Sequence, residues 1–164
     1  MILDYYFKRP LFYDYLISII VIVVVYYSKY YFCFPFPKLE RSITISSDLA
    51  NVAFTVAGFI LTLLTLLITF KSSSKISKES YSYDETVFNM FFVSNLYFET
   101  IKILKNCIKS LIVIAFIGYS LKLGLSKEII NYIFYYNIFA LCIIVLTLYR
   151  CLLILNKILK MQEK

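Results

Sequence analysis

Long apolar runs separated by short polar stretches dominate the chain. A helix of about 20 apolar residues is long enough to cross the hydrocarbon core of a bilayer. Four runs approach or exceed that length, at about residues 11–33, 49–70, 105–123 and 129–155. Only 3 Gly and 3 Pro interrupt the 164 residues, which favours long helices over the short strands of a barrel. We therefore predict an all-α, polytopic membrane protein of four transmembrane helices, in one domain over residues 1–164.

The first run has no small-x-small cleavage site and continues through bulky aromatic residues, so we expect it to remain as an anchor. Pro35 and Pro37 end it. Asp14 and Lys29 lie toward its two ends, where long or flexible side chains reach the headgroups. We therefore expect neither charge to need a buried partner, and we expect no ionisable residue near the middle of a span, which disfavours a proton-coupled carrier.

The second run is the clearest, because residues 49–70 contain no charged residue. Asp48 is the expected N-cap of this helix. Residues 38–47 before it have the composition of a short polar connection, and the Ser- and Lys-rich stretch after Phe70 that of a linker.

The second half of the chain contains two further predicted helices. Ser82 and Glu85 have capping-box spacing, so we expect an amphipathic helix to begin near Asp84 and to lead without interruption into the third span. The linker and this amphipathic part cover about residues 71–104 and are expected to be cytoplasmic. Gly124 and Ser126 are the expected caps of a tight turn between the third and fourth spans.

The distribution of basic residues predicts the orientation. Arg150 and Lys157 mark the expected exit of the fourth span. Twelve basic residues lie on the side of the two termini and the 71–104 segment, and five on the other side, so the positive-inside rule predicts cytoplasmic termini. Phe, Tyr, Ile, Lys and Asn are abundant, whereas Trp is absent and Arg is scarce. This composition is typical of AT-rich coding, so we expect a bacterial inner (cytoplasmic) membrane. The net charge of +7 then matches anionic headgroups rather than nucleic acid.

A regular polar pattern runs through the second span. Its polar residues and glycine are spaced 3, 4, 3, 4, 3, 4, 3 and form what we call the polar seam: Asp48, Asn51, Thr55, Gly58, Thr62, Thr65, Thr69 and Ser72. An average spacing of 3.5 residues places all of them along one side of a helix. We expect this side to face protein or water rather than lipid, either as a packing surface inside the four-helix bundle or as the lining of an oligomeric pore.

Two smaller patterns accompany the seam. In the fourth span Asn137, Ala140 and Thr147 belong to a stripe that is expected to pack against the polar seam of the second span. In the third, Lys102, Lys105 and Lys109 recur at helical spacing, either as a stripe facing solvent and headgroups or as a docking surface for a cytoplasmic protein partner.

No residue pattern indicates catalysis. The chain has no His, no Cys-x-x-Cys pair among its 4 Cys and no Gly-rich phosphate loop, so we predict no catalytic residues, no cofactor and no metal site.

The stretch from Asp48 to Lys71, DLANVAFTVAGFILTLLTLLITFK, resembles the corresponding helix of small uncharacterised four-helix bacterial membrane proteins, some of which are encoded beside anti-phage defence systems. This resemblance implies a membrane component of a defence system: an effector that forms homo-oligomers and permeabilises the membrane, or a sensor paired with a cytoplasmic protein. The alternative is a structural or assembly subunit of a larger membrane complex, without pore activity.

Overall fold

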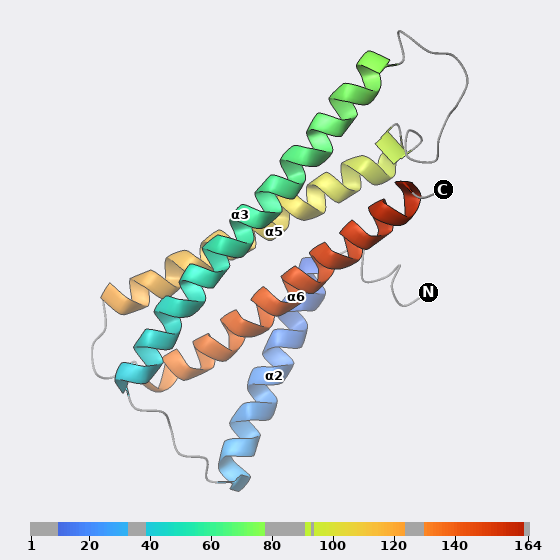
Figure 1. Ribbon diagram of the computed structural model, residues 1–164. Helices are drawn as coiled ribbons and strands as arrows, with labels where there is room; N and C mark the ends of the chain where they lie inside the picture. The colour runs from blue at the N-terminus through green and yellow to red at the C-terminus, as the bar shows by residue number, and fades with distance from the viewer. Residues whose placement is uncertain (1–9, 33–38, 78–90, 93, 124–129, 163–164) are drawn as a thin grey trace.

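Four long helices make up almost all of the described chain. The computed structural model describes residues 10–32, 39–77, 91–92, 94–123 and 130–162 (Figure 1). The helices are α2 (Pro10–Phe32), α3 (Leu39–Ser77), α5 (Asn95–Leu123) and α6 (Ile130–Gln162). The predicted all-α class is confirmed.

Three of these helices are long and apolar enough to cross a membrane. The candidate spans are Pro10–Ser28 in α2, Glu40–Ser72 in α3 and Tyr132–Lys160 in α6. They indicate a multi-pass membrane protein. α5 is not among the candidates, so the predicted crossing by residues 105–123 stays a prediction.

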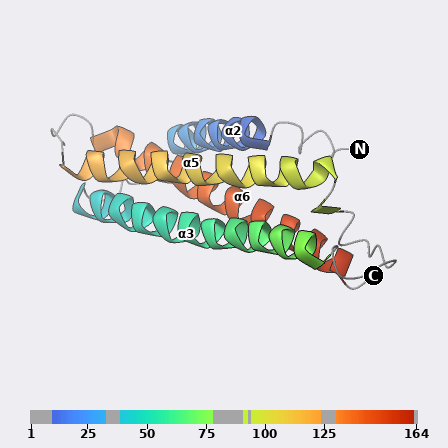
Figure 2. The ribbon, with the colours of Figure 1, turned by 90° about the horizontal axis from the view of Figure 1, so that it is seen from above.

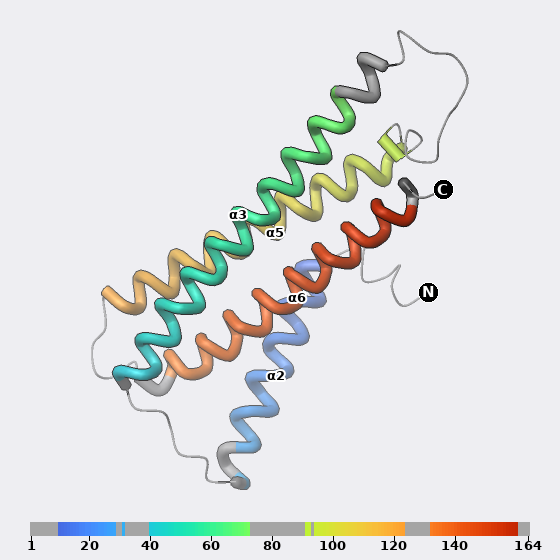
Figure 3. The backbone as a smooth tube through the Cα atoms, in the orientation of Figure 1, coloured from blue at the N-terminus to red at the C-terminus, as the bar shows by residue number. Residues whose placement is uncertain are grey.

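The helices alternate in direction along the chain (Figure 3). α3 and α5 lie side by side and antiparallel: the Lys71 ammonium is 4.1 Å from the ring centroids of both Tyr97 and Phe98 near one end. Toward the other end, the rings of Phe54 and Tyr119 stack with centroids 6.1 Å apart. α6 packs against both, and α2 lies on the opposite side of the molecule from α3 (Figure 2).

Small side chains let the helices approach one another closely. On α3 the buried face includes Ala50, Ala53 and Ala57. These alanines share one hydrophobic core with larger buried side chains from α5 and α6, such as Leu111 and Ile143. Many large apolar side chains on the outer surface are exposed, among them Phe116 at 70%. Such a surface suits hydrocarbon as the surrounding solvent.

The start of α3 differs from the prediction. Residues 39–47 are helical rather than a polar connection, so Asp48 lies inside the helix and is not its N-cap. Within this segment the Thr44 hydroxyl donates to the Glu40 carbonyl at 2.8 Å, and the Ser46 hydroxyl lies 3.2 Å from the Ser42 carbonyl. Hydroxyls placed in this way are compatible with a helix. At the other end α3 runs on to Ser77, into the predicted linker.

The helix before the third span is interrupted. The Ser94 hydroxyl and backbone N–H both donate to the Phe91 carbonyl, at 2.8 and 3.2 Å, and α5 begins only at Asn95. The predicted continuous helix from Asp84 is therefore wrong at this point. The proposed Ser82–Glu85 capping box and the Gly124 and Ser126 caps lie outside the described residues.

Candidate functional site

A buried ion pair joins α2 to α6. The Asp14 Oδ2 atom lies 2.8 Å from the Arg150 Nη1 atom, and both side chains have 0% exposure. Each residue lies inside a candidate membrane span. Charged groups within a membrane are costly and are retained mainly where they are paired or functional.

This ion pair corrects one prediction. Asp14 does have a buried partner, and that partner, Arg150, is itself fully buried. The expectations that Arg150 marks the exit of the fourth span and that no ionisable residue lies near the middle of a span stay predictions, because Asp14 lies near the start of its candidate span and Arg150 beyond the centre of its own. The sequence did contain a sign that Arg150 is buried. Ile143, Thr147 and Arg150 are spaced by 4 and then 3 residues, which places Arg150 on the buried side of α6. The Lys29 side chain lies outside the described residues.

α5 makes polar contacts beside the Asp14–Arg150 ion pair. The Arg150 Nη2 group donates to the Cys107 Sγ atom at 3.1 Å. The Tyr15 and Ser110 hydroxyls form a 2.8 Å hydrogen bond between α2 and α5. We call Asp14, Tyr15, Cys107, Ser110 and Arg150 the charge-pair layer.

A second polar cluster holds α3, α5 and α6 together near the other end of the bundle. The Ser46 hydroxyl donates to the Asn137 side-chain oxygen at 2.6 Å, and the Asn137 amide donates to the Ser42 carbonyl at 2.9 Å. The Tyr136 hydroxyl donates to the Ile114 carbonyl at 2.5 Å. None of these contacts involves α2.

The predicted stripe on α6 is buried. Asn137, Ala140 and Thr147 are 6%, 0% and 0% exposed. Asn137 contacts Ser42 and Ser46 of α3, which lie before the polar seam in the sequence. The stripe thus meets residues of α3 that the sequence did not single out.

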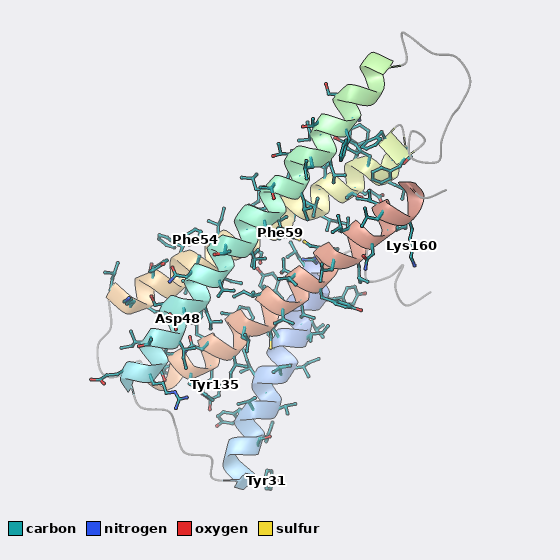
Figure 4. All side chains as sticks on the ribbon, viewed as in Figure 1. Tyr31, Asp48, Phe54, Phe59, Tyr135 and Lys160 are labelled. Carbon is teal, nitrogen blue, oxygen red and sulfur yellow. The ribbon has the colours of Figure 1, made fainter. Side chains whose placement is uncertain are left out.

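The polar seam lies on the outer surface of the chain. All eight of its residues are exposed: Asp48, Asn51, Thr55, Gly58, Thr62, Thr65, Thr69 and Ser72. It runs along α3 from Asp48, which is labelled in Figure 4. The opposite side of α3 carries the buried residues, including Ala53, Ile60 and Leu64. Within this chain the seam is therefore not the surface that packs the bundle.

The seam's threonines bond to their own helix. Thr55, Thr65 and Thr69 donate to the carbonyl four residues earlier, at 2.9–3.0 Å, and Thr62 to that of Phe59 at 2.7 Å. These bonds lower the cost of surrounding the hydroxyls with apolar groups. The Asn51 side-chain oxygen accepts a hydrogen bond from the Tyr119 hydroxyl, which ties the start of the seam to α5.

The three lysines of α5 share its exposed side. Lys102, Lys105 and Lys109 are exposed, while Leu104 and Cys107 between them are buried. This placement suits either solvent and headgroups or a docked partner, so both readings stay open.

No group of three or more metal-ligating side chains occurs in the part of the chain that the structure describes. The polar features described are buried contacts between helices, the polar seam of α3 and the exposed lysines of α5. Comparison with protein families, with curated proteins and with solved structures gives no match. The resemblance of residues 48–71 to four-helix bacterial membrane proteins stays a prediction.

Proposed function

We propose that this chain is a multi-pass membrane protein that acts by assembling with further copies through the polar seam of α3. The observation that carries the proposal is the placement of the seam: its eight residues are exposed, and the core-forming face of α3 lies on the other side. In lipid, hydroxyls and small side chains favour contact with another helix because they permit close backbone approach. A second copy would supply such a helix.

The contacts between α3 and α5 bear on the number of crossings. The two helices are in contact from Lys71 and Tyr97 near one end to Ser47 and Lys122 near the other, where the Lys122 ammonium donates to the Ser47 hydroxyl at 3.1 Å. A bilayer that α3 crosses would therefore contain much of α5 as well. This supports the proposal of a fourth crossing by residues 105–123.

Two modes of action fit an assembled seam. In the first, the threonines line a hydrated path and copies permeabilise the membrane, as an effector does. In the second, the seam only packs, and the chain is a structural or assembly subunit. The hydrogen bonds from the threonines to their own helix favour the second mode, because these hydroxyls need no further partner. A role in anti-phage defence, as effector or sensor, is a narrower proposal that rests on the resemblance alone.

Gly58→Leu tests assembly. A Cβ atom on Gly58 would meet nothing within 4 Å, so the chain's own fold accommodates a side chain there. In nanodiscs, native mass spectrometry should show oligomers for the unaltered chain and monomers for Gly58→Leu. The matched control is Phe59→Leu, an exposed neighbour outside the seam, which should leave the oligomer intact. An unaltered chain that is monomeric in nanodiscs contradicts the proposal.

Conductance separates the two modes. The double variant Thr62→Val, Thr65→Val keeps the size of both side chains and removes both hydroxyls. A hydrated pore should lose conductance in planar bilayers through dewetting, whereas a packing seam has no conductance to lose.

A further inference from the structure

The way α2 is attached differs from the way the other helices are held. Among the residues of α2 whose side chains are described, only Asp14 and Ser18 are buried, and both are polar. Of the residues in the apolar window of the α2 span, 11% are buried inside the fold, compared with 33% in the α3 and α6 spans. None of the described apolar side chains of α2 is therefore fully buried, and those that face the rest of the chain are half-buried.

Apolar contact contributes less to such an attachment in a bilayer than in water. Lipid tails are as apolar as Leu or Val side chains, so an apolar helix face gains little by exchanging lipid for protein. Specific contacts therefore matter for the attachment, and the charge-pair layer supplies them: the Asp14–Arg150 ion pair and the Tyr15–Ser110 hydrogen bond. Ring contacts add to them, with Tyr15 stacked on Phe139 at 5.9 Å.

The remaining three helices are also joined by contacts that do not involve α2. α3, α5 and α6 are joined by the cluster around Ser46 and Asn137, and by the Tyr136 bond to the Ile114 carbonyl. They also share the buried apolar core, which includes Ile60, Leu111 and Ile143.

We propose that the Asp14–Arg150 ion pair is a latch that holds α2 on the α5–α6 face, so that α2 can be released while α3, α5 and α6 stay assembled. The latch is independent of the seam and of the proposed assembly. It makes α2 the movable element of the fold, and its release uncovers the Arg150 guanidinium inside the membrane.

Two engineered disulfides test the latch. One reports whether α2 is attached to α6, and the other reports whether α3 and α5 remain packed together. Tyr26→Cys with Tyr135→Cys reports α2 on α6, because these rings lie with centroids 6.2 Å apart. Phe54→Cys with Tyr119→Cys reports α3 on α5, where the centroids are 6.1 Å apart. Both pairs are made in a background of Cys33→Ser and Cys142→Ala and oxidised in bilayer vesicles.

The decisive variant is Asp14→Leu with Arg150→Met, which removes both charges and leaves no uncompensated one. The latch predicts that the α2–α6 disulfide yield falls by about tenfold or more while the α3–α5 yield is unchanged. The charge exchange Asp14→Arg with Arg150→Asp should recover much of the α2–α6 yield.

Two results would overturn the latch. A doubly neutral variant that still cross-links α2 at the unaltered yield would show that apolar packing holds α2. Loss of both disulfides together would show that the pair stabilises the whole fold rather than α2 alone.

Discussion

Gly118 of α5 faces Ala50 of α3 so closely that a Cβ atom added to Gly118 would lie 3.2 Å from the Ala50 Cβ. The same added atom would lie 3.2 Å from both the Ser46 carbonyl oxygen and the Tyr136 hydroxyl. Three helices thus meet at this glycine, because α3 contributes Ser46 and Ala50, and α6 contributes Tyr136.

Gly118→Ala should therefore destabilise the bundle. The new methyl group would press on backbone that cannot move independently of α3, and such overpacking costs about 1–3 kcal/mol. Thermal unfolding in detergent, followed by circular dichroism, measures the effect. Gly58→Ala is the matched control: its Cβ atom meets open space, so helix propensity should raise stability by up to about 1 kcal/mol. Equal effects at the two glycines would contradict this account of the packing.

Asn137→Leu should weaken the contact between α6 and α3. The substitution removes the bonds to the Ser46 hydroxyl and the Ser42 carbonyl, at a cost of about 1–3 kcal/mol. The same unfolding measurement applies, and Asn156→Leu, at an exposed position of α6, should change stability by less than about 0.5 kcal/mol. A harmless Asn137→Leu would show that the buried amide contributes no net stability.

Thr147→Val should be neutral or stabilising. The Thr147 hydroxyl is buried and has no hydrogen-bond partner among the described residues. Replacing this hydroxyl with a methyl group removes the free-energy cost of burying it and breaks no hydrogen bond. We expect stability to stay the same or rise by up to about 1 kcal/mol. Ser110→Ala, which removes the bond to Tyr15, should instead lower it by about 1 kcal/mol. A marked loss in Thr147→Val would indicate that the hydroxyl binds a group absent from this account.

Hydropathy predicted the apolar helices well, because each span is a local property of the sequence. The predicted run at 11–33 corresponds to α2, and the run at 129–155 overlaps α6 from residue 130 onward. The start of α3 could not be predicted in the same way. In the sequence alone, Ser42 and Ser46 indicate a polar connection. In the structure both bond to Asn137, which lies 91 residues after Ser46.

The charge-pair layer was missed for a related reason. Hydropathy counts the cost of each charge separately. The charges of Asp14 and Arg150 neutralise one another only because the fold brings together two helices that are far apart in the sequence. Asn137, Ala140 and Thr147 lie on the buried side of α6, as does Arg150, but Asn137 contacts Ser42 and Ser46 rather than the polar seam. The polar seam was identified from its spacing, but spacing alone says nothing about which neighbour it faces.

Cross-linking between copies in the bilayer tests the assembly of the seam most directly. Thr62→Cys lies on the polar seam, and Leu61→Cys lies at the same depth but about 100° around the helix; both positions are exposed in the single chain. In a background of Cys33→Ser and Cys142→Ala, oxidation in vesicles should give disulfide-linked dimers from Thr62→Cys and few from Leu61→Cys. Equal yields from the two variants, or dimers from Leu61→Cys alone, would contradict the assignment of the seam as the surface through which this protein assembles.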